Sequence, residues 1–333
     1  MPWVLFFISA AIITFASMQL SKYGDAIAIR TRLGGMFIGT LLIAGATSLP
    51  ELLTTINSVT QGLPELAAGN ILGSNMFNML ILAILDLLHY KRRILRKAAM
   101  KHALSGSLAV MLIALGVFFI MADISQKIQL GSFVVGLDSL ILIVAYIFAM
   151  SLISKQSRSP VSTQAPEAIP NDVPKLWISL VGFGLAAGAL IIVTPWMVSA
   201  SADIAEITGL GTTFIGSTLV AFVTSIAELV TTISAARIGA DDMAIGNLFG
   251  SNMFNMLALG LTDLFFVGGA FLGIVDSSFL LIGMLGLIMT VLGLIGNLAR
   301  IERRFLFIEI DALLLILIYL GGMALLYVRG ITP

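Results

Sequence analysis

Two stretches of this chain are close copies of each other. Residues 39–79 and 216–256 align without an insertion at a constant offset of 177 positions, which carries Glu51 onto Glu228. Both copies keep the same order of hydroxyl, carboxylate, glycine and amide side chains. Because an internal duplication repeats a folding unit, the chain is predicted to consist of two halves with one architecture.

The composition restricts this architecture to a membrane. Hydrophobic residues occupy 59% of the 333 positions and charged residues 11%, and the mean hydropathy is +1.06. A soluble domain carries about 25% charged residues, so a single core surrounded by water is excluded. The net charge of zero gives no sign of a nucleic-acid partner, and the absence of cysteine excludes disulfides, thiolate metal sites and cysteine nucleophiles. His89 and His102 are expected in a basic loop, so an imidazole metal site inside the membrane is not expected.

Ten apolar stretches are each long enough to cross a hydrocarbon core, which needs about 20 helical residues. They lie near residues 2–20, 36–60, 65–87, 103–121, 131–153, 176–200, 212–236, 243–265, 277–298 and 305–328. The N-terminus lacks the basic region of a secretory signal, so the first stretch is predicted to be a retained span. Segment 154–174 carries four prolines among polar residues, as a flexible linker does. The predicted fold class is all-α, a polytopic membrane protein of ten transmembrane helices in two five-helix repeats, 1–153 and 175–333.

Basic residues predict how the spans are oriented. Sixteen of the eighteen lysines and arginines fall on one side of the predicted membrane, and Lys127 and Arg329 are the exceptions. By the positive-inside rule that side is cytoplasmic, so the linker 154–174 is inside and both termini are outside. Five spans is an odd number, so the second repeat is predicted to be inverted relative to the first. Inverted repeats are the architecture of secondary transporters, whose substrate site lies near the membrane midplane between the halves.

Two ionisable residues are predicted at the centre of the membrane. Glu51 and Glu228 fall in the middle of the second and seventh spans, where a charged side chain costs about 2.5 kcal/mol or more and marks function by default. Hydroxyl and amide side chains recur at helical spacing in both copies, at Thr47, Ser48, Ser74, Asn78, Thr224, Ser225, Ser251 and Asn255. These groups offer oxygen but no sulfur or imidazole nitrogen. Hard cations such as Ca²⁺ take about 6–8 oxygen ligands, so the set suits a cation site.

Helix breaks and close helix contacts are predicted around these groups. Pro50 lacks an N–H, which predicts that a backbone carbonyl near Ala44 is freed toward the site. Gly69 and Gly73 have the small-residue spacing that lets membrane helices approach closely, and the second copy repeats the pair. They are expected to bring the third span against the second, and the eighth against the seventh.

The motifs T-S-x-x-E and G-N-x-x-G-S-N-x-F-N resemble those of the cation/Ca²⁺ antiporter superfamily, and of sodium/calcium exchangers in particular. The duplicated segments are similar to the two α-repeats of that family over about residues 34–88 and 211–265. The resemblance implies a multi-pass protein of a prokaryotic cell membrane that binds its ions between the repeats. The side chains and backbone carbonyls that it implies as ion ligands are those of Ala44, Thr47, Ser48, Glu51, Ser74, Asn78, Ala221, Thr224, Ser225, Glu228, Ser251 and Asn255.

Three departures from the family pattern bear on this expectation. Ala46 and Val223 stand where many relatives have glycine. Ala227 replaces the usual proline of the second copy, which predicts a straighter seventh span than second span. Asn255 stands where some relatives have aspartate, which removes a third carboxylate and argues against potassium co-transport.

The resulting hypothesis is a secondary antiporter that exchanges Na⁺ for Ca²⁺ by alternating access, with no cofactor, no enzymatic activity and no protein partner beyond membrane lipid. One Ca²⁺ or two Na⁺ would balance the two glutamates. A proton-driven exchanger of Ca²⁺ or another divalent cation would use the same glutamates and stays open. A passive cation channel is a further alternative without a pore-loop signature, and no intramembrane protease motif is present.

Other polar residues are expected to have structural roles. Asn75 and Asn252 are predicted to pack helices together, and the aspartates that end the third and eighth spans are predicted to cap or to lie at the interface. Asp138 and Asp311 are predicted to hydrogen-bond within their own halves. The basic run after the third span is expected to set topology and to contact anionic lipid.

Overall fold

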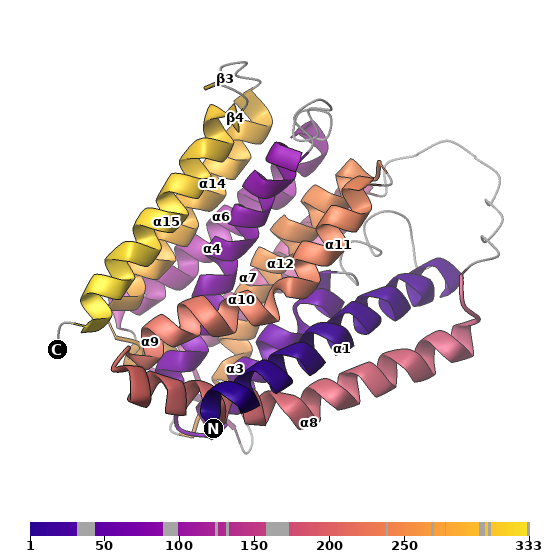
Figure 1. Cartoon of the computed structure of the whole chain (residues 1–333). Helices are drawn as coiled ribbons and strands as arrows, with labels where there is room; N and C mark the ends of the chain where they lie inside the picture. The colour runs from indigo at the N-terminus through magenta and orange to yellow at the C-terminus, as the bar shows by residue number, and fades with distance from the viewer. Residues whose placement is uncertain are drawn as a thin grey trace.

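The computed structural model describes residues 1–31, 44–88, 99–123, 126–130, 133–157, 173–237, 239–267, 270–276, 278–299, 304–305 and 308–331. Within these residues the chain is almost entirely helical (Figure 1). The long helices are α1 (Pro2–Thr31), α4 (Pro64–Leu88), α6 (Ala99–Ala122), α7 (Leu137–Ser157), α8 (Leu176–Thr208), α12 (Asp241–Thr262), α14 (Ser278–Ala299) and α15 (Ile310–Ile331). The short helices are α3 (Leu49–Thr60), α9 (Thr212–Ile215), the π-helix η1 (Gly216–Val220), α10 (Ala221–Thr224), α11 (Ile226–Arg237) and α13 (Phe271–Ile274).

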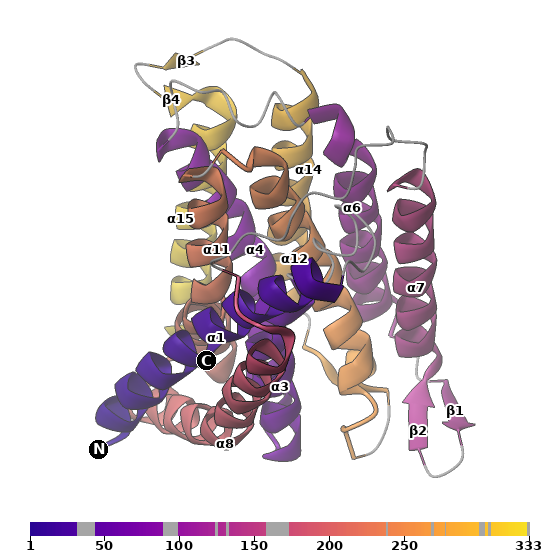
Figure 2. The same cartoon turned by 90° about the vertical axis from the view of Figure 1, so that its right-hand side faces the viewer.

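Two short antiparallel ribbons depart from the all-helical prediction. Strand β1 (Lys127–Leu130) pairs with β2 (Phe133–Gly136), and β3 (Arg304–Phe305) pairs with β4 (Ile308–Glu309). The first ribbon projects beyond the end of α7 (Figure 2). The fifth predicted span therefore starts its helix at residue 137 instead of 131, because β-branched residues favour the strand and an acidic residue favours the first helical turn. At its other end α7 runs to residue 157, so part of the predicted linker is helical.

Seven helices of the described chain are long and apolar enough to cross a membrane, and the pair Thr212–Thr224 and Ile226–Arg237 adds an eighth, bent span. Helix α12 has 22 residues, which at 1.5 Å per residue gives about 33 Å, but its side chains are too polar to pass the same test. The first part of the second predicted span lies outside the described residues. Ten spans therefore remain a prediction.

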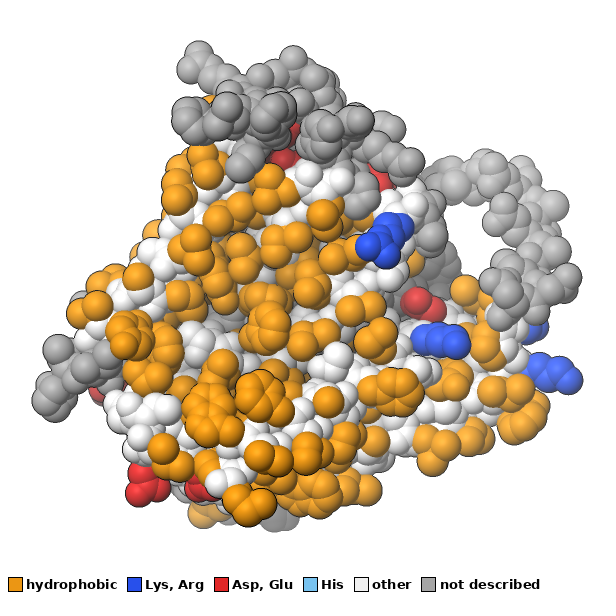
Figure 3. Space-filling view, in the orientation of Figure 1, with side chains coloured by type: hydrophobic (Ala, Val, Ile, Leu, Met, Phe, Trp, Pro, Cys, Tyr) orange, Lys and Arg blue, Asp and Glu red, His pale blue; other side chains and the backbone are white. Residues whose placement is uncertain are grey.

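The long helices differ in direction and in how far they are enclosed. Helices α1 and α8 run side by side, obliquely to the other long helices (Figure 1). In an apolar 18-residue stretch of α4, 78% is buried, whereas in the equivalent stretch of α8 only 22% is buried. Helix α4 is therefore central and α8 peripheral. Exposed apolar side chains such as Phe7, Phe148 and Leu185 cover the outside. Figure 3 shows this apolar surface with few charges on the face in view, as contact with lipid requires.

Backbone packing joins the two repeats. A Cβ atom at Gly73 would lie 2.5 Å from the carbonyl oxygen of Ser217, and Gly69 faces the same π-helical segment. In the second copy, Gly250 faces Ala44 of the first. The prediction that these glycines serve contacts within each repeat is wrong, although α4 does also pack on α3. Spacing identifies a close approach, but the partner depends on how the repeats cross.

Candidate cation site

Each of the two membrane-centre glutamates is bound by a serine of the other repeat. Glu51 and Glu228 lie in the first turns of α3 and α11. Ser225 Oγ donates to Glu51 Oε1 at 2.9 Å, and Ser48 Oγ donates to Glu228 Oε1 at 2.9 Å. All four side chains are buried. Residues that the offset of 177 relates therefore make equivalent bonds, each to the other repeat.

Both serines sit at breaks between helical segments. The backbone angles φ and ψ are −90° and 7° at Ser48 and −85° and 10° at Ser225. The second copy bends by 42° between Thr212–Thr224 and Ile226–Arg237 although Ala227 replaces proline. Because residues 32–43 lie outside the described residues, the predicted difference in straightness between the second and seventh spans stays a prediction. Thr224 supplies a physical reason for the bend, since its hydroxyl oxygen lies 3.2 Å from each of the carbonyl oxygens three and four residues back. Such back-bonding competes with the helical hydrogen bonds and bends helices without proline.

The two alanine carbonyls that the family resemblance implies as ligands are engaged in both copies. Ala44 O accepts from the Thr47 hydroxyl at 3.1 Å, and Ala221 O accepts from the Thr224 hydroxyl at 3.2 Å. Each also accepts the backbone N–H four residues ahead, at 3.0 and 3.1 Å. The carbonyl of Ala44 itself is therefore not the one that Pro50 frees. The helical bond that proline removes is the one to residue 46.

Two further asparagines connect the repeats, and the sequence analysis assigned them no role. The Thr224 hydroxyl lies 3.1 Å from Asn70 Oδ1 and the Thr47 hydroxyl 3.4 Å from Asn247 Oδ1, so each amide oxygen competes with the backbone carbonyls for the single hydroxyl proton. Asn70 Nδ2 in turn donates to the backbone oxygen of Glu51 at 3.1 Å. The available signal was their equal position in both motifs, since a buried polar residue repeated at one offset has equivalent partners.

Several buried oxygens at the site have no hydrogen-bond partner in the described part of the chain. Ser251 Oγ lies 3.5 Å from Glu228 Oε1, at the long limit for a hydrogen bond. The unpartnered oxygens are Oε2 of Glu51, Oε2 of Glu228, Oγ of Ser74, Oδ1 of Asn78 and Oδ1 of Asn255. Buried polar atoms are normally paired, so unpaired oxygens on both glutamates and on three other predicted ligands need an explanation. A cation supplies one, because it binds oxygens and needs no proton.

The amides beside the site form a second reciprocal exchange. Asn78 Nδ2 donates to Asn252 Oδ1 at 2.9 Å, and Asn255 Nδ2 donates to Asn75 Oδ1 at 3.0 Å. The predicted helix-packing role of Asn75 and Asn252 is confirmed, because both bonds join α4 to α12. Ser74, Asn78 and Asn255 make no direct hydrogen bond to either glutamate.

Two of the other acidic residues accept hydrogen bonds from backbone N–H groups. Asp263 accepts from the backbone N–H of Gly136 and from that of Phe271 at 2.6 Å, so its predicted capping role is confirmed. Asp138 accepts from the N–H of Ser139 at 2.7 Å, within its own half as predicted. A further acidic group consists of Asp86, Glu309 and Asp311, whose carboxylate oxygens lie within 4.8 Å of one another.

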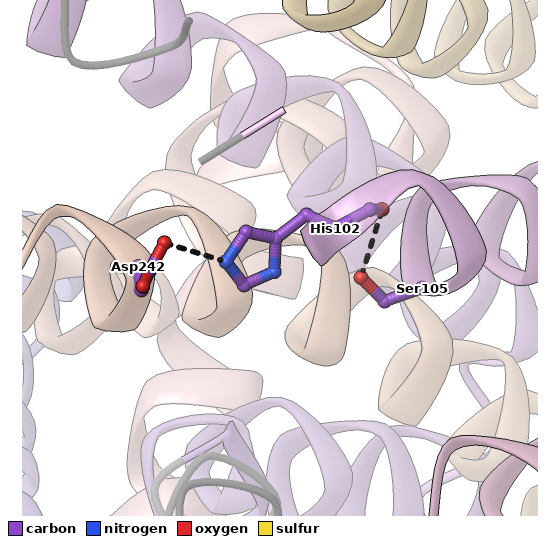
Figure 4. Close-up of polar contacts among 3 residues, drawn as sticks. All are labelled: His102, Ser105 and Asp242. Atoms are coloured by element: carbon purple, nitrogen blue, oxygen red, sulfur yellow. Dashed lines mark hydrogen bonds and ion pairs between the residues drawn. The ribbon is translucent and has the colours of Figure 1, made fainter. Parts of the chain in front are cut away.

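His102 lies in the first part of helix α6, so its predicted place in a loop is wrong. Its Nε2 is 3.7 Å from Oδ1 of Asp242, in the first turn of α12 (Figure 4). The Ser105 hydroxyl donates to the His102 carbonyl at 3.1 Å. His102 therefore links α6 to α12, and its acidic partner is Asp242 rather than Glu51 or Glu228. His89 lies outside the described residues.

Comparison with known proteins identifies the family. The family model described as sodium/calcium exchanger protein matches residues 1–155 and 178–328. This chain belongs to the sodium/calcium exchanger family. It is therefore an integral, multi-pass membrane protein of an antiporter family. It is 28% identical over 328 residues to a candidate antiporter named CaxA from Alkalimonas amylolytica, across 97% of this chain and 98% of that protein.

Solved structures of exchangers share the fold. The H⁺/Ca²⁺ exchanger CAX superposes with a TM-score of 0.71 at 12% identity, over 99% of this chain and 85% of that one. The sodium–calcium exchanger NCX_Mj superposes with a TM-score of 0.59 at 20% identity, over 97% of this chain and 99% of that one. At such identities the likeness concerns the fold alone, and the two neighbours differ in the ion exchanged for Ca²⁺.

Proposed function

We propose that this protein is a secondary antiporter that exchanges Na⁺ for Ca²⁺ across a membrane by alternating access. The observation that carries the proposal is that Glu51, Glu228 and three other predicted ligands, Ser74, Asn78 and Asn255, each keep a buried oxygen without a hydrogen-bond partner. Within the described residues, no arginine or lysine lies within 4.0 Å of either carboxylate, so a mobile cation can balance their charge. Ca²⁺ and Na⁺ bind such oxygens, and the family is the one of sodium/calcium exchangers.

Charge balance explains why such a site exchanges ions instead of leaking them. Two carboxylates carry two negative charges, which one Ca²⁺ or two Na⁺ neutralise. Moving an unneutralised charge through the membrane centre costs about 2.5–3.5 kcal/mol per group, so the empty site alternates slowly and the loaded site rapidly. The proposed ligands are Ala44, Thr47, Ser48, Glu51, Ser74, Asn78, Ala221, Thr224, Ser225, Glu228, Ser251 and Asn255.

The proposal includes an inverted ten-span topology. Repeats 1–153 and 175–333 are placed with opposite orientations in the membrane, with the linker 154–174 in the cytoplasm and both termini outside. The reciprocal bonds of Ser48 and Ser225 support it, because a two-fold relation between repeats generates contacts in matched pairs. Two copies related in this way offer packings of similar energy that open to either side.

The test is Ca²⁺ uptake into proteoliposomes. Vesicles loaded with Na⁺ are diluted into Na⁺-free medium with Ca²⁺, and a protonophore with strong buffer clamps the pH. We expect uptake that depends on the Na⁺ gradient, and we expect Glu51→Gln and Glu228→Gln each to abolish it. Glu206→Gln, the same change at an exposed position of α8, is the matched control and should transport normally.

The outcomes separate the alternatives. Uptake driven by a proton gradient without Na⁺ would make the protein an H⁺/Ca²⁺ exchanger, which keeps the site but replaces the driving ion. Uptake without any counter-ion would indicate a passive channel. Near-normal uptake by either glutamine variant would overturn the two-carboxylate mechanism.

A further inference from the structure

The amide of Asn78 belongs to a chain of hydrogen bonds that begins outside the two duplicated segments, 39–79 and 216–256. Thr290, on α14, donates its hydroxyl proton to the carbonyl of Gly286 at 2.7 Å. Asn252 Nδ2 donates to Thr290 Oγ1 at 3.3 Å, and Asn78 Nδ2 donates to Asn252 Oδ1 at 2.9 Å. The chain thus joins α14 to α12 and α12 to α4.

The direction of this chain is determined at its far end. A carbonyl can only accept, so the single proton of Thr290 is directed to Gly286. Thr290 can then only accept from Asn252, which must turn its NH₂ group toward the hydroxyl and its oxygen toward Asn78. Asn78 in turn must present its NH₂ group to Asn252. Its own Oδ1 is left buried and without a partner, which is the end of an amide that attracts a cation.

The first repeat lacks this anchor. Glycines on α6 and α14 follow the same offset of 177, since Gly116 faces Met256 and Leu259 while Gly293 faces Met79 and Leu82. The same offset places Ile113 where the second half has Thr290. Correspondingly, Asn75 Nδ2 is buried without a partner, whereas its equivalent in Asn252 is bonded. Nothing on α6 therefore determines which way the amide pair of Asn75 and Asn255 is turned.

We infer that Thr290 is a positioning residue for cation binding, which acts through Asn252 to hold the carbonyl oxygen of Asn78 toward the ion. The two amide ligands are consequently unequal, with Asn78 fixed and Asn255 free to exchange its oxygen and nitrogen. This inference deepens the proposed function and rests on it. It assigns a role to a helix that neither duplicated motif includes.

The test is Ca²⁺ binding by the purified full-length protein in detergent, measured by isothermal titration calorimetry. Thr290→Val keeps the shape but removes the hydroxyl, and we expect its dissociation constant to rise about fivefold, the equivalent of one lost hydrogen bond. Thr290→Ser restores the hydroxyl and should lie within about twofold of the wild type. Thr262→Val is the matched control, because Thr262 is equally buried and donates the same bond, at 2.7 Å, to a carbonyl four residues back.

A double-mutant cycle separates positioning from general destabilisation. If Thr290 acts through Asn78, Thr290→Val should add less than about twofold in an Asn78→Ala background. An unchanged affinity of Thr290→Val, a failed rescue by Thr290→Ser or an additive cycle would each overturn the inference while the proposed function stands. A wild-type protein that binds no Ca²⁺ would overturn the proposed function and this inference with it. If Thr290→Val does not fold, Thr290→Ala takes its place in the same comparison.

Discussion

Replacing Gly73 by alanine should push the two repeats apart at their closest backbone contact. A Cβ atom there would lie 2.5 Å from the carbonyl oxygen of Ser217, 2.6 Å from its Cα and 2.9 Å from its carbonyl carbon. Ordinary contacts begin at 3.4 Å, so α4 and the π-helix must move apart by about 0.9 Å. All three obstructing atoms belong to backbone, and no side chain can rotate away.

The expected cost follows from this geometry. Overpacking a well-packed core costs about 1–3 kcal/mol, and a rigid backbone obstacle places Gly73→Ala at the upper end, near 3 kcal/mol. Gly184→Ala is the matched control, since Gly184 lies within helix α8 and its added Cβ meets nothing within 4 Å. Replacing a helical glycine by alanine without a clash should stabilise by about 0.5–1 kcal/mol.

The assay is thermal unfolding of both purified variants in the same detergent, followed by tryptophan fluorescence. Gly73→Ala should lower the Tm by roughly 5 °C or more, and Gly184→Ala should leave it unchanged or raise it slightly. Ca²⁺ affinity should fall in Gly73→Ala as well, because the displaced segment leads directly into the site. Equal Tm values for the two variants would refute the claim that backbone packing holds the repeats together.

Three further predictions concern the site and the topology. Ser48→Ala and Ser225→Ala should each raise the dissociation constant for Ca²⁺ about tenfold and by similar factors, because each removes one 2.9 Å bond to a carboxylate; clearly unequal factors in calorimetry would contradict the reciprocal geometry. Ile113→Thr should tighten Ca²⁺ binding about twofold or more by giving the unpartnered amide of the first repeat an acceptor, and a weakened or unchanged affinity would count against the unequal-amide inference. Single cysteines placed by Thr60→Cys and Arg237→Cys in this cysteine-free chain should react with a membrane-impermeant maleimide from opposite faces, and labelling from one face would exclude inverted repeats.

The duplication made the composition of the site predictable but not its contacts. Glu51, Ser48 and their copies could be identified because hydroxyls and a carboxylate recur at one offset inside apolar stretches. That each serine binds the glutamate of the other repeat depends on how the repeats cross, which spacing within one helix does not encode. The glycine contacts were assigned to the wrong helices for the same reason.

Helix breaks were only partly predictable. Pro50 indicates the first break in the sequence. The second break forms without proline, because the Thr224 hydroxyl competes for backbone carbonyls. The same hydroxyl is also an expected ligand, so one threonine serves both the bend and the site. Thr290 could not be found from the motifs, because its effect on Asn78 passes through a residue of another helix.

The reciprocal bonds make the site a property of the assembled pair of repeats. Glu51 takes its hydroxyl from the second repeat and Glu228 takes its hydroxyl from the first, so neither repeat alone holds a complete set of contacts. A cation that binds both carboxylates stabilises the packing in which they meet, since any ligand favours the state that binds it. Without the cation, two ionised carboxylates at this interface would repel each other. In the proposed mechanism ion occupancy is therefore coupled to how the repeats pack, which is what exchange by alternating packings requires.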